Sequence, residues 1–526
     1  MTDFLASIGY ESWILHALIW GPLLAMIHVL VSPEGRAKHI AFRWSLALLV
    51  VSLGLWWAFE PGSGGFTMTS SRPWISAWGV DYALGVDGIS LFMILLTTFT
   101  TPIAILGSFE YIAKREKAFY ALMLLLETGV VGVFAATDVF LFYVFFELTL
   151  VPMYFIVGIW GGERRVYAAV KFFLYTALGS LLMLVAILYL YFQAGASSFS
   201  IAALLDAPLT LQEQLWLFTA FAIAFAIKVP VFPLHTWLPD AHVEAPTPGS
   251  VVLAAVLLKM GTYGFLRFLL PMFPEAAQHP TVVTVMMVLG VVGIIYAAWV
   301  AAVQPDAKKL VAYTSVAHMG FVVIGIFALT VNGIQGGLVV MISHGISTGA
   351  LFLLLGMMYE RRHTRLIEDF GGIGRVAPLF ATAFVITALA SIGLPGTSGF
   401  VGEFLALLGT FETHPTAAIL ASTGVIFAAY YMLPMVQRVL FNKLDKEENR
   451  SFADLSRREI WILAPLLALM IWIGTNPSPF LERMGPSVER VIERVQLSSQ
   501  EARLEDVEPP GPATVADPTP ARTGGQ

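Results

Sequence analysis

Two lysines in long apolar runs are the first sign of chemistry in this sequence. Lys228 ends the run FAIAFAIK, and Lys259 lies in the run VVLAAVLLK. Between them, Pro230, Pro233 and Pro239 interrupt a helix. A lysine near the centre of a membrane helix costs roughly 2.5–3.5 kcal/mol on insertion scales, and a broken helix is tolerated at membrane depth only where protein or a water-filled cavity satisfies the freed backbone groups. This combination predicts an ion path.

Other ionisable residues lie in apolar runs of the same kind. Burial favours the neutral form of a lysine, and a nearby carboxylate restores its affinity for a proton. Histidines titrate near neutrality and relay protons. We therefore expect Glu147 to modulate Lys228, and Glu403 to offer the final proton acceptor. The candidate proton path consists of Glu127, Glu147, Lys228, Lys259, His318, His344 and Glu403.

Each of these residues also has a purely structural interpretation. Glu147 and Lys228 could form a buried salt bridge that only fixes helix packing, although desolvation offsets much of the attraction in such pairs. His318 and His344 could be helix–helix hydrogen-bonding residues, and Glu127 could cap a neighbouring helix. Sodium would favour a cluster of oxygen ligands, and no dense cluster of Asp, Asn and Ser is apparent, although unwound backbone carbonyls at the breaks could still bind it. The histidines interpreted as interfacial or structural are His16, His28 and His242.

The apolar runs that hold these residues are about 20 residues long and recur along most of the chain. Of the 526 residues, 57% are hydrophobic and 13% are charged, whereas about a quarter of residues are charged in soluble domains. A membrane β-barrel would show alternating segments of about ten residues. We expect an all-α polytopic membrane protein with about 14 membrane segments. They lie near 12–31, 40–59, 86–109, 117–136, 138–160, 167–192, 213–240, 249–271, 281–302, 309–330, 334–358, 376–412, 417–440 and 459–475.

Two of these segments are broken in the same way. The seventh breaks at KVPVFPLH and the twelfth breaks at SIGLPGTSGFVGEF. They lie five segments apart, so they cross the membrane in opposite directions, which is the pattern of inverted repeats with an ion site at the midplane. Within the polar end of the chain, SVERVIERVQ could form a short amphipathic helix. The expected units are N-terminal helices over 1–110, repeats over 117–271 (segments 4–8) and 281–440 (segments 9–13), a last membrane helix within 441–486, and a disordered tail over 487–526.

Basic residues gather in alternate loops between the segments. The positive-inside rule places these loops in the cytoplasm. An even number of segments then puts both termini on the other side, so we expect a multi-pass protein of the bacterial inner (cytoplasmic) membrane with periplasmic termini. The loops hold Arg36, Lys38 and Arg43; Lys114, Arg115 and Lys117; Arg164, Arg165 and Lys171; Lys308 and Lys309; Arg361, Arg362, Arg365 and Arg375; and Arg438, Lys443, Lys446, Arg450, Arg457 and Arg458.

Composition also excludes several functions. The sequence has no cysteine, so it cannot supply thiolate ligands to iron–sulfur clusters or attach haem through CxxCH. Neither a Walker A loop nor a GxGxxG motif after a strand occurs, so nothing indicates nucleotide binding. Any electron transfer must therefore take place in a partner. We expect no metal and no cofactor in this chain, and no nucleic-acid partner.

The motifs resemble those of a known family. LFYVFFELTLVPMYFIVGIWGG, FAIKVPVFPLHTWLPDAHVEAPTPGSVVLAAVLLKMGTYGFLRF, KKLVAYTSVAHMGFVVIGI and GLPGTSGFVGEF are similar to stretches of the antiporter-like membrane subunits of proton-pumping NADH–quinone oxidoreductase, respiratory complex I. The resemblance covers roughly residues 80–475 and is closest to the branch of chain M, or subunit 4. Glu403 in GFVGEF carries that choice, since chains L and N usually place a lysine there.

The resemblance implies 14 helices with two inverted five-helix repeats. It also implies that Glu147 and Lys228 form a charge pair, Lys259 carries the proton at the centre, His318 and His344 line the path, and Glu403 is the exit group. FMN, iron–sulfur clusters, NADH and quinone are then expected in partner subunits, and other membrane-arm subunits, including neighbouring antiporter-like ones, are expected beside this chain in the lipid bilayer.

Two other interpretations remain open. Multisubunit sodium/proton antiporters and membrane-bound hydrogenases share the same core, so the chain could belong to a secondary transporter without redox chemistry. It could also be a membrane scaffold whose charges only pack helices. Four such groups at the membrane centre would cost roughly 10–14 kcal/mol before pairing, which disfavours a scaffold.

Overall fold

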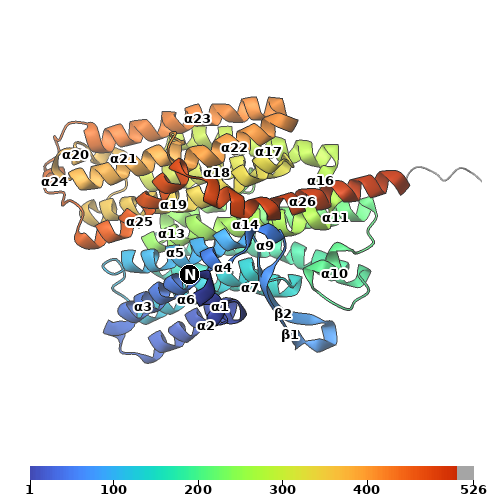
Figure 1. Ribbon diagram of the computed structural model, residues 1–526. Helices are drawn as coiled ribbons and strands as arrows, with labels where there is room; N and C mark the ends of the chain where they lie inside the picture. Colours follow the sequence, from blue (N-terminus) through green and yellow to red (C-terminus); the bar gives the residue numbers. More distant parts are fainter. Residues whose placement is uncertain (506–526) are drawn as a thin grey trace, which may run out of the picture.

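The computed structural model describes residues 1–505, with side chains up to residue 497 apart from Ser63. Most of its helices run along one direction, side by side (Figure 1). Twelve of the described helices are long and apolar enough to cross a membrane, which confirms an all-α polytopic membrane fold. They are α2 (Tyr10–Val31), η1 to α4 (Glu34–Ala58), α5 (Ser90–Gly107), α6 (Glu116–Ala135), α7 and α8 (Val139–Leu148, Leu150–Trp160), α9 (Arg165–Gln193), α13 to α15 (Thr247–Met272), α17 (Pro280–Ala302), α18 (Ala307–Phe327), α19 (Val331–Arg362), α23 with η7 (Pro415–Phe441) and α25 (Arg457–Thr475).

The two broken segments of the sequence are broken in the structure. The seventh consists of α11 (Leu211–Lys228) and α12 (Trp237–Glu244), and the twelfth of α21 (Pro378–Ile392) and α22 (Ser398–Thr413). Gly393 ends α21 with φ +82°, a left-handed conformation that costs glycine little. With the twelve continuous spans, these two segments account for all the segments that hydropathy indicated.

The eighth segment is more irregular than its sequence suggested. It contains two π-helical turns, η4 (Leu253–Leu257) and η5 (Phe265–Leu269), separated by α14 (Leu258–Gly264). π-Helical turns inside α-helices are frequent at functional sites because they change which backbone groups are paired. Lys259 is the second residue of α14, two positions after the last residue of the first of these turns. The hydropathy of the segment does not predict these turns.

One β-hairpin also lay outside the predictions. Strands β1 (Thr67–Ile75) and β2 (Val80–Val86) pair antiparallel, with Ser71 opposite Ala83 and Pro73 opposite Asp81. The hairpin joins the second segment to the third. Asp138, which caps α7, accepts a hydrogen bond from the backbone N–H of Asp81 (3.1 Å) and so ties β2 to the bundle.

The C-terminal part of the described chain is a long helix, α26 (Ser478–Glu505), which runs across the bundle (Figure 1). The helix expected at SVERVIERVQ lies within α26, and the prediction of a disordered tail over 487–526 is wrong for residues 487–505. Met484, Val488, Val491 and Val495 are buried and recur at helical spacing, so one face of α26 packs against the bundle. The remainder of the predicted tail, 506–526, lies outside the described residues.

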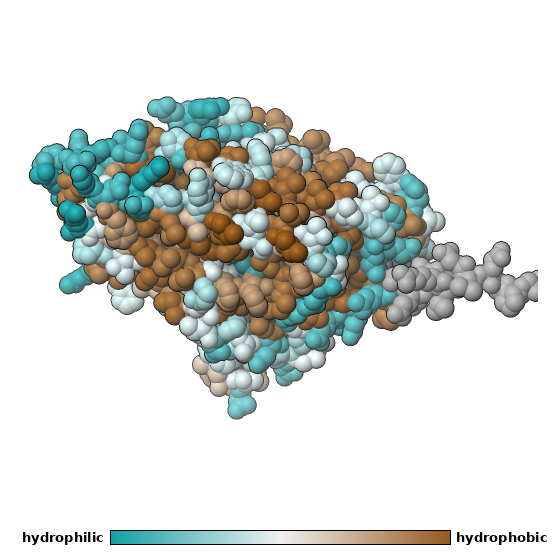
Figure 2. Space-filling model, turned by 90° about the horizontal axis from the view of Figure 1, so that it is seen from above, coloured by the Kyte–Doolittle hydropathy of each residue, from teal (hydrophilic) through white to brown (hydrophobic). Residues whose placement is uncertain are grey.

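The surface shows where polar and apolar residues gather. In Figure 2, hydrophobic residues cover a broad area in the middle of the molecule, and hydrophilic residues cover the end at which α20 (Ile373–Val376) and α24 (Glu447–Arg450) lie. This end carries the arginine-rich stretch 361–375 and the lysines of the stretch 442–450. It is the end that the sequence predicts to be cytoplasmic.

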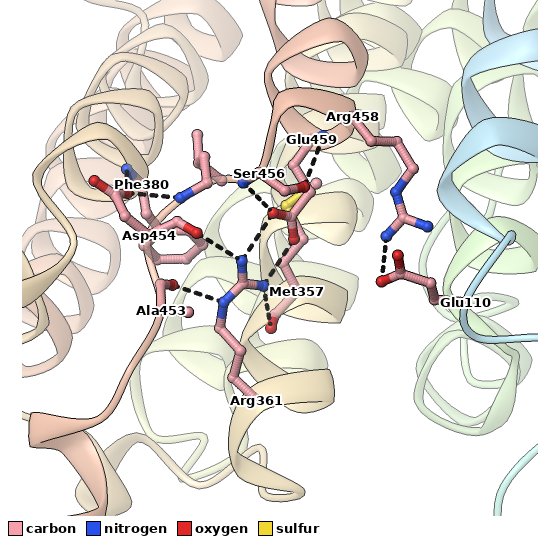
Figure 3. Close-up of polar contacts among 10 residues, drawn as sticks. Glu110, Met357, Arg361, Phe380, Ala453, Asp454, Ser456, Arg458 and Glu459 are labelled. Atoms are coloured by element: carbon pink, nitrogen blue, oxygen red, sulfur yellow. Dashed lines mark hydrogen bonds and ion pairs between the residues drawn. The ribbon is translucent and has the colours of Figure 1, made fainter.

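A cluster around Arg361 fastens that end of the bundle (Figure 3). Arg361, in the last turn of α19, pairs with both carboxylate oxygens of Glu459 at 2.8 Å and donates to the backbone carbonyls of Ala453 (2.8 Å) and Asp454 (3.2 Å). Glu459 in turn completes the capping box of α25 with Ser456. The Arg361 guanidinium therefore holds both the loop before α25 and the first turn of α25 against α19.

Arg361→Ala should destabilise the folded protein, since it leaves the buried Glu459 carboxylate without its cation. Removing one partner of a buried pair costs about 3–5 kcal/mol, so we expect a lower midpoint of thermal unfolding. The matched control is Arg450→Ala, whose pair with Glu447 is exposed and should contribute about 0–1 kcal/mol. Equal midpoints for the two variants would show that the Arg361 cluster does not stabilise the fold.

Candidate proton-transfer site

The centre of the site is a direct contact between Lys259 of α14 and His344 of α19. Lys259 is fully buried, and its Nζ lies 2.7 Å from His344 Nδ1. The same ammonium donates to the carbonyl of Ala254, a residue of the π turn η4. Because a protonated lysine can only donate, Nδ1 then accepts and the hydrogen of a neutral imidazole is on Nε2. His344 Nε2 has no hydrogen-bond partner among the described residues and is free to pass that proton on.

A second contact continues the chain away from Lys259. His318 of α18 lies 3.0 Å from a carboxylate oxygen of Glu403 in α22, through Nδ1. Its ring centroid is 5.7 Å from that of His344, at an interplanar angle of 64°. All four side chains are buried. Lys259, His344, His318 and Glu403 thus form one row that crosses from the eighth segment to the second broken segment.

Small polar residues fill the space around the two histidines. Ser391, near the end of α21, lies 3.4 Å from His318 Nε2, and Ser343 of α19 contacts Ser398 of α22 at 2.8 Å. A small cavity of about 10 Å³ lies between them, which is roughly the space of one water molecule. It is lined by His318, Ser343, His344, Ser347, Ser391, Gly399 and Glu403, among others. The serines were not predicted, since serines are frequent in any membrane helix.

The second break is what brings Glu403 to this row. Gly393 turns the chain at the end of α21, and a Cβ at that position would lie 2.8 Å from the second carboxylate oxygen of Glu403. Gly399 packs so closely on Ala390 that a Cβ there would lie 2.1 Å from the Ala390 carbonyl oxygen. The glycines of SIGLPGTSGF therefore allow α22 to begin directly beside the end of α21, with its first buried carboxylate facing His318.

Gly393→Ala should displace the Glu403 carboxylate, because the new methyl group lies within contact distance of it and the left-handed φ is strained for alanine. We expect proton transfer through this row to fall severalfold in a variant that still folds. Gly396→Ala is the control: φ is +91° there, but the added Cβ meets nothing within 4 Å. If both variants lose the same activity, backbone strain alone explains the loss, and the contact with Glu403 plays no part.

The structure contradicts the alternative that Glu147 and Lys228 form a buried salt bridge, whereas their role as a modulating charge pair stays a prediction. The two side chains are not in salt-bridge contact: Lys228 Nζ and Glu147 Oε1 are both buried without a hydrogen-bond partner in the part of the chain that the structure describes. Lys228 instead faces two aromatic rings, Phe146 at 4.9 Å and Phe172 at 5.7 Å from Nζ to the ring centroids. The charges interact electrostatically at longer range, so the pair is an open one.

Glu127 of α6 stands apart from the row of contacts. It is buried, and neither carboxylate oxygen has a hydrogen-bond partner among the described residues. The alternative that it caps a neighbouring helix needs a hydrogen bond to a backbone N–H. Because Glu127 makes no such bond within residues 1–505, that alternative is wrong. The place of Glu127 in a proton path stays a prediction.

Two further buried charges escaped the sequence analysis. Arg267 donates to Asp87 at 2.5 Å and to the Tyr263 hydroxyl at 3.1 Å, and thereby joins the eighth segment to the start of α5. Lys308 was counted as a loop residue but is buried. Across residues 1–505, no group of three or more His, Asp and Glu side chains is placed to hold a metal ion.

A polytopic bundle with two broken segments and a buried row of lysine, histidine and glutamate defines an ion-translocating membrane protein. The chain belongs to the NADH:quinone oxidoreductase/Mrp antiporter transmembrane family, whose model matches residues 136–428. It is 47% identical to NADH-quinone oxidoreductase subunit M of Rhodobacter capsulatus over 88% of this chain and 91% of that protein.

Solved structures agree with this membership. A chain of respiratory complex I from Thermus thermophilus superposes with a TM-score of 0.85 at 33% identity, covering 92% of this chain and 99% of that one. A chain of the Mrp complex from Dietzia superposes with a TM-score of 0.79 at 21% identity, over 92% and 99% of the two chains, which shows the shared fold. The sequence thus lies nearer to the complex I chain than to the antiporter chain.

Proposed function

We propose that this chain is a proton-translocating membrane-arm subunit of NADH:quinone oxidoreductase, with redox chemistry in its partner subunits. The observation that carries the proposal is the buried row of Lys259, His344, His318 and Glu403, in which close polar contacts join the two outer pairs and the two imidazole rings between them have their centroids 5.7 Å apart. Each member can bind and release one proton. The identity to subunit M of another bacterium supports the assignment to complex I over an antiporter.

In the proposed path, a proton on Lys259 passes to His344 through the 2.7 Å contact. Loss of the Nε2 hydrogen then moves a proton toward His318 across the small cavity, and His318 gives its proton to Glu403 at 3.0 Å. Histidine suits the middle positions because it can take up a proton at one ring nitrogen and release one from the other. Glu403 is the exit group from which the proton leaves the row.

Glu147 and Lys228 act as the modulating pair of this proposal. Their separation matters, because a closed ion pair would hold its charges in place, whereas an open pair can close. A proton or a charge movement in the neighbouring subunit that brings Glu147 and Lys228 together would change the electrostatic field at Lys259. Glu127 is assigned to the path as a further proton acceptor on α6.

The remaining features of the proposal concern direction and surroundings. Protons move from the basic, cytoplasmic side to the periplasm, both termini are periplasmic, and segments 4–8 and 9–13 are inverted repeats. Support comes from the basic loops and from the two breaks in oppositely directed segments. FMN, iron–sulfur clusters, NADH and quinone belong to partner subunits, and neighbouring antiporter-like subunits adjoin this chain in the membrane.

A mild-detergent purification of the tagged chain tests this function. We expect it to retain flavin- and iron–sulfur-containing partners, with NADH:quinone oxidoreductase activity that pumps protons after reconstitution into vesicles. Small membrane partners without a redox protein, together with sodium-driven proton movement, would establish an antiporter instead. Partners with a nickel–iron centre would indicate a hydrogenase.

A further inference from the structure

An open cavity lies at the basic end of the molecule, where α6 and α9 begin and α8 ends. It measures about 640 Å³, and we call it the α6–α8 cavity. Its walls are the loop between α5 and α6, the last turn of α8 and the start of α9. Glu110 in the same loop pairs with Arg458 of α25 at 2.7 Å, which places the cavity at the end that holds the Arg361 cluster (Figure 3). The lining residues that matter here are Lys114, Arg115, Ile159, Trp160 and Arg165.

Three exposed cations line this cavity without an anionic partner. Lys114, Arg115 and Arg165 form no salt bridge with a carboxylate in the part of the chain that the structure describes. Arg165 donates to the backbone carbonyl of Gly162 at 3.2 Å and keeps further N–H groups for another acceptor. The bordering stretches 111–118 and 158–166 hold five basic and two acidic residues. The cavity is therefore suited to an anion.

An apolar strip runs from the cavity toward the middle of the membrane segment. Val151, Phe155 and Ile159 recur at every fourth residue of α8, so they lie on one face of the helix, and all three are exposed. Ile159 also lines the cavity. From Val151 to Ile159 the strip is about 12 Å long, which is most of the roughly 15 Å of hydrocarbon in one leaflet. The strip is therefore long enough to hold much of an acyl chain.

Trp160 joins the cationic wall of the cavity to the apolar strip. Its indole Nε1 donates to the backbone carbonyl of Lys114 at 2.7 Å, and its ring packs edge-to-face on Phe119 with the centroids 5.2 Å apart. The end of α8 is thus fixed against the loop that carries Lys114 and Arg115. Tryptophan is enriched at the boundary between headgroups and hydrocarbon, so Trp160 indicates that the cavity lies at headgroup level.

We propose that the α6–α8 cavity binds the phosphate headgroup of an anionic phospholipid, whose acyl chain lies along the strip on α8. This inference goes beyond the proposed function and does not depend on the row of Lys259, His344, His318 and Glu403. Basic pockets between membrane helices bind anionic headgroups, and a guanidinium donates two N–H groups at once to phosphate oxygens. A free phosphate or an acidic protein segment would use the cations alone. A phospholipid uses the cations and the apolar strip together, which favours it.

A phosphatidylglycerol with a photoreactive group at the end of one acyl chain tests this site in the intact, detergent-solubilised complex. We expect illumination to attach it to the peptide 150–160, and the labelling to saturate as its concentration rises. The triple variant Lys114→Gln/Arg115→Gln/Arg165→Gln should raise the half-saturating concentration by about 100-fold. This factor corresponds to about 3 kcal/mol, or roughly 1 kcal/mol for each basic residue near a membrane surface. The variant should still assemble, because all three side chains are exposed.

Two further variants separate the headgroup from the acyl chain. Lys443→Gln/Arg450→Gln/Arg457→Gln is the matched control, because it removes three exposed basic side chains from the same end of the molecule but outside the cavity. It should leave the half-saturating concentration unchanged. Phe155→Ala shortens the apolar strip and keeps every cation, so it should raise that concentration by about tenfold for loss of an aromatic contact.

Several results would overturn the lipid site. Equal labelling by a zwitterionic phosphatidylcholine analogue, or an unchanged half-saturating concentration in the triple variant, would mean that the cavity does not recognise an anionic headgroup. Inorganic phosphate that competes as well as the lipid would identify a site for the free anion. If the peptide 150–160 is not labelled in the intact complex, a neighbouring subunit covers the cavity instead. None of these measurements uses proton pumping, so their failure would leave the proposed function standing.

Discussion

Replacing Lys259 by methionine should stop proton transfer through this subunit while the complex still assembles. Methionine keeps the length of the side chain, so it avoids the cavity that an alanine would leave. It removes the protonatable group that contacts His344 Nδ1, and the row then begins at a histidine with no donor. We expect proton pumping to fall by about 100-fold, the effect expected for loss of a positioned proton-transfer group. Coupled quinone reduction should fall with it.

Two measurements distinguish a block in the proton path from failed assembly and from failed redox chemistry. Native electrophoresis shows whether the variant complex is intact, and NADH oxidation with an artificial electron acceptor shows whether the redox partners still work. Lys443→Met is the control, since it removes a basic side chain from an exposed loop. Pumping at the normal rate in an intact Lys259→Met complex would remove Lys259 from the proton path and would leave the row without a centre.

The sequence predicts most of the architecture, for physical reasons that are easy to follow. A membrane helix needs about 20 apolar residues, so each segment is visible on its own without knowledge of its neighbours. The two breaks are visible as well, because proline removes a backbone donor and glycine alone adopts the conformation seen at Gly393 without strain. Ionisable residues in such segments are rare, and this rarity marks Lys259, His318, His344 and Glu403 as functional candidates.

What escaped prediction depends on three-dimensional contacts. Whether Glu147 and Lys228 touch is set by the packing of α7 against α11, and their sequence positions do not encode that distance. The π turns around Lys259 arise in a segment whose hydropathy is that of a regular helix. Lys308 resembles a loop lysine because its burial comes from α12 and from the loop after α19. The length of α26 was hidden because it lies on the bundle as an amphipathic helix of low average hydropathy.

Replacing Glu403 by glutamine should have an effect as large as the loss of Lys259. Glutamine has nearly the same shape and can still accept a hydrogen bond from His318, but it cannot take up a proton. We therefore expect pumping to fall by about 100-fold without a loss of assembly. Glu412→Gln is the matched control on the same helix, because Glu412 is exposed and only accepts a hydrogen bond from Asn332 at 2.7 Å. Release of protons on the side opposite the basic loops is the quantity to measure.

The double variant His318→Gln/Glu403→Gln decides whether the contacts form one path. If both residues lie on one path, the second substitution lowers the pumping rate no further than the first. The double variant should then pump at the rate of the slower single variant. Groups that act independently would show losses that multiply. Because His318 and Glu403 are 3.0 Å apart, we expect strong non-additivity. Multiplied losses would mean that the two residues serve separate routes, and the row drawn from Lys259 to Glu403 would then describe packing instead of transport.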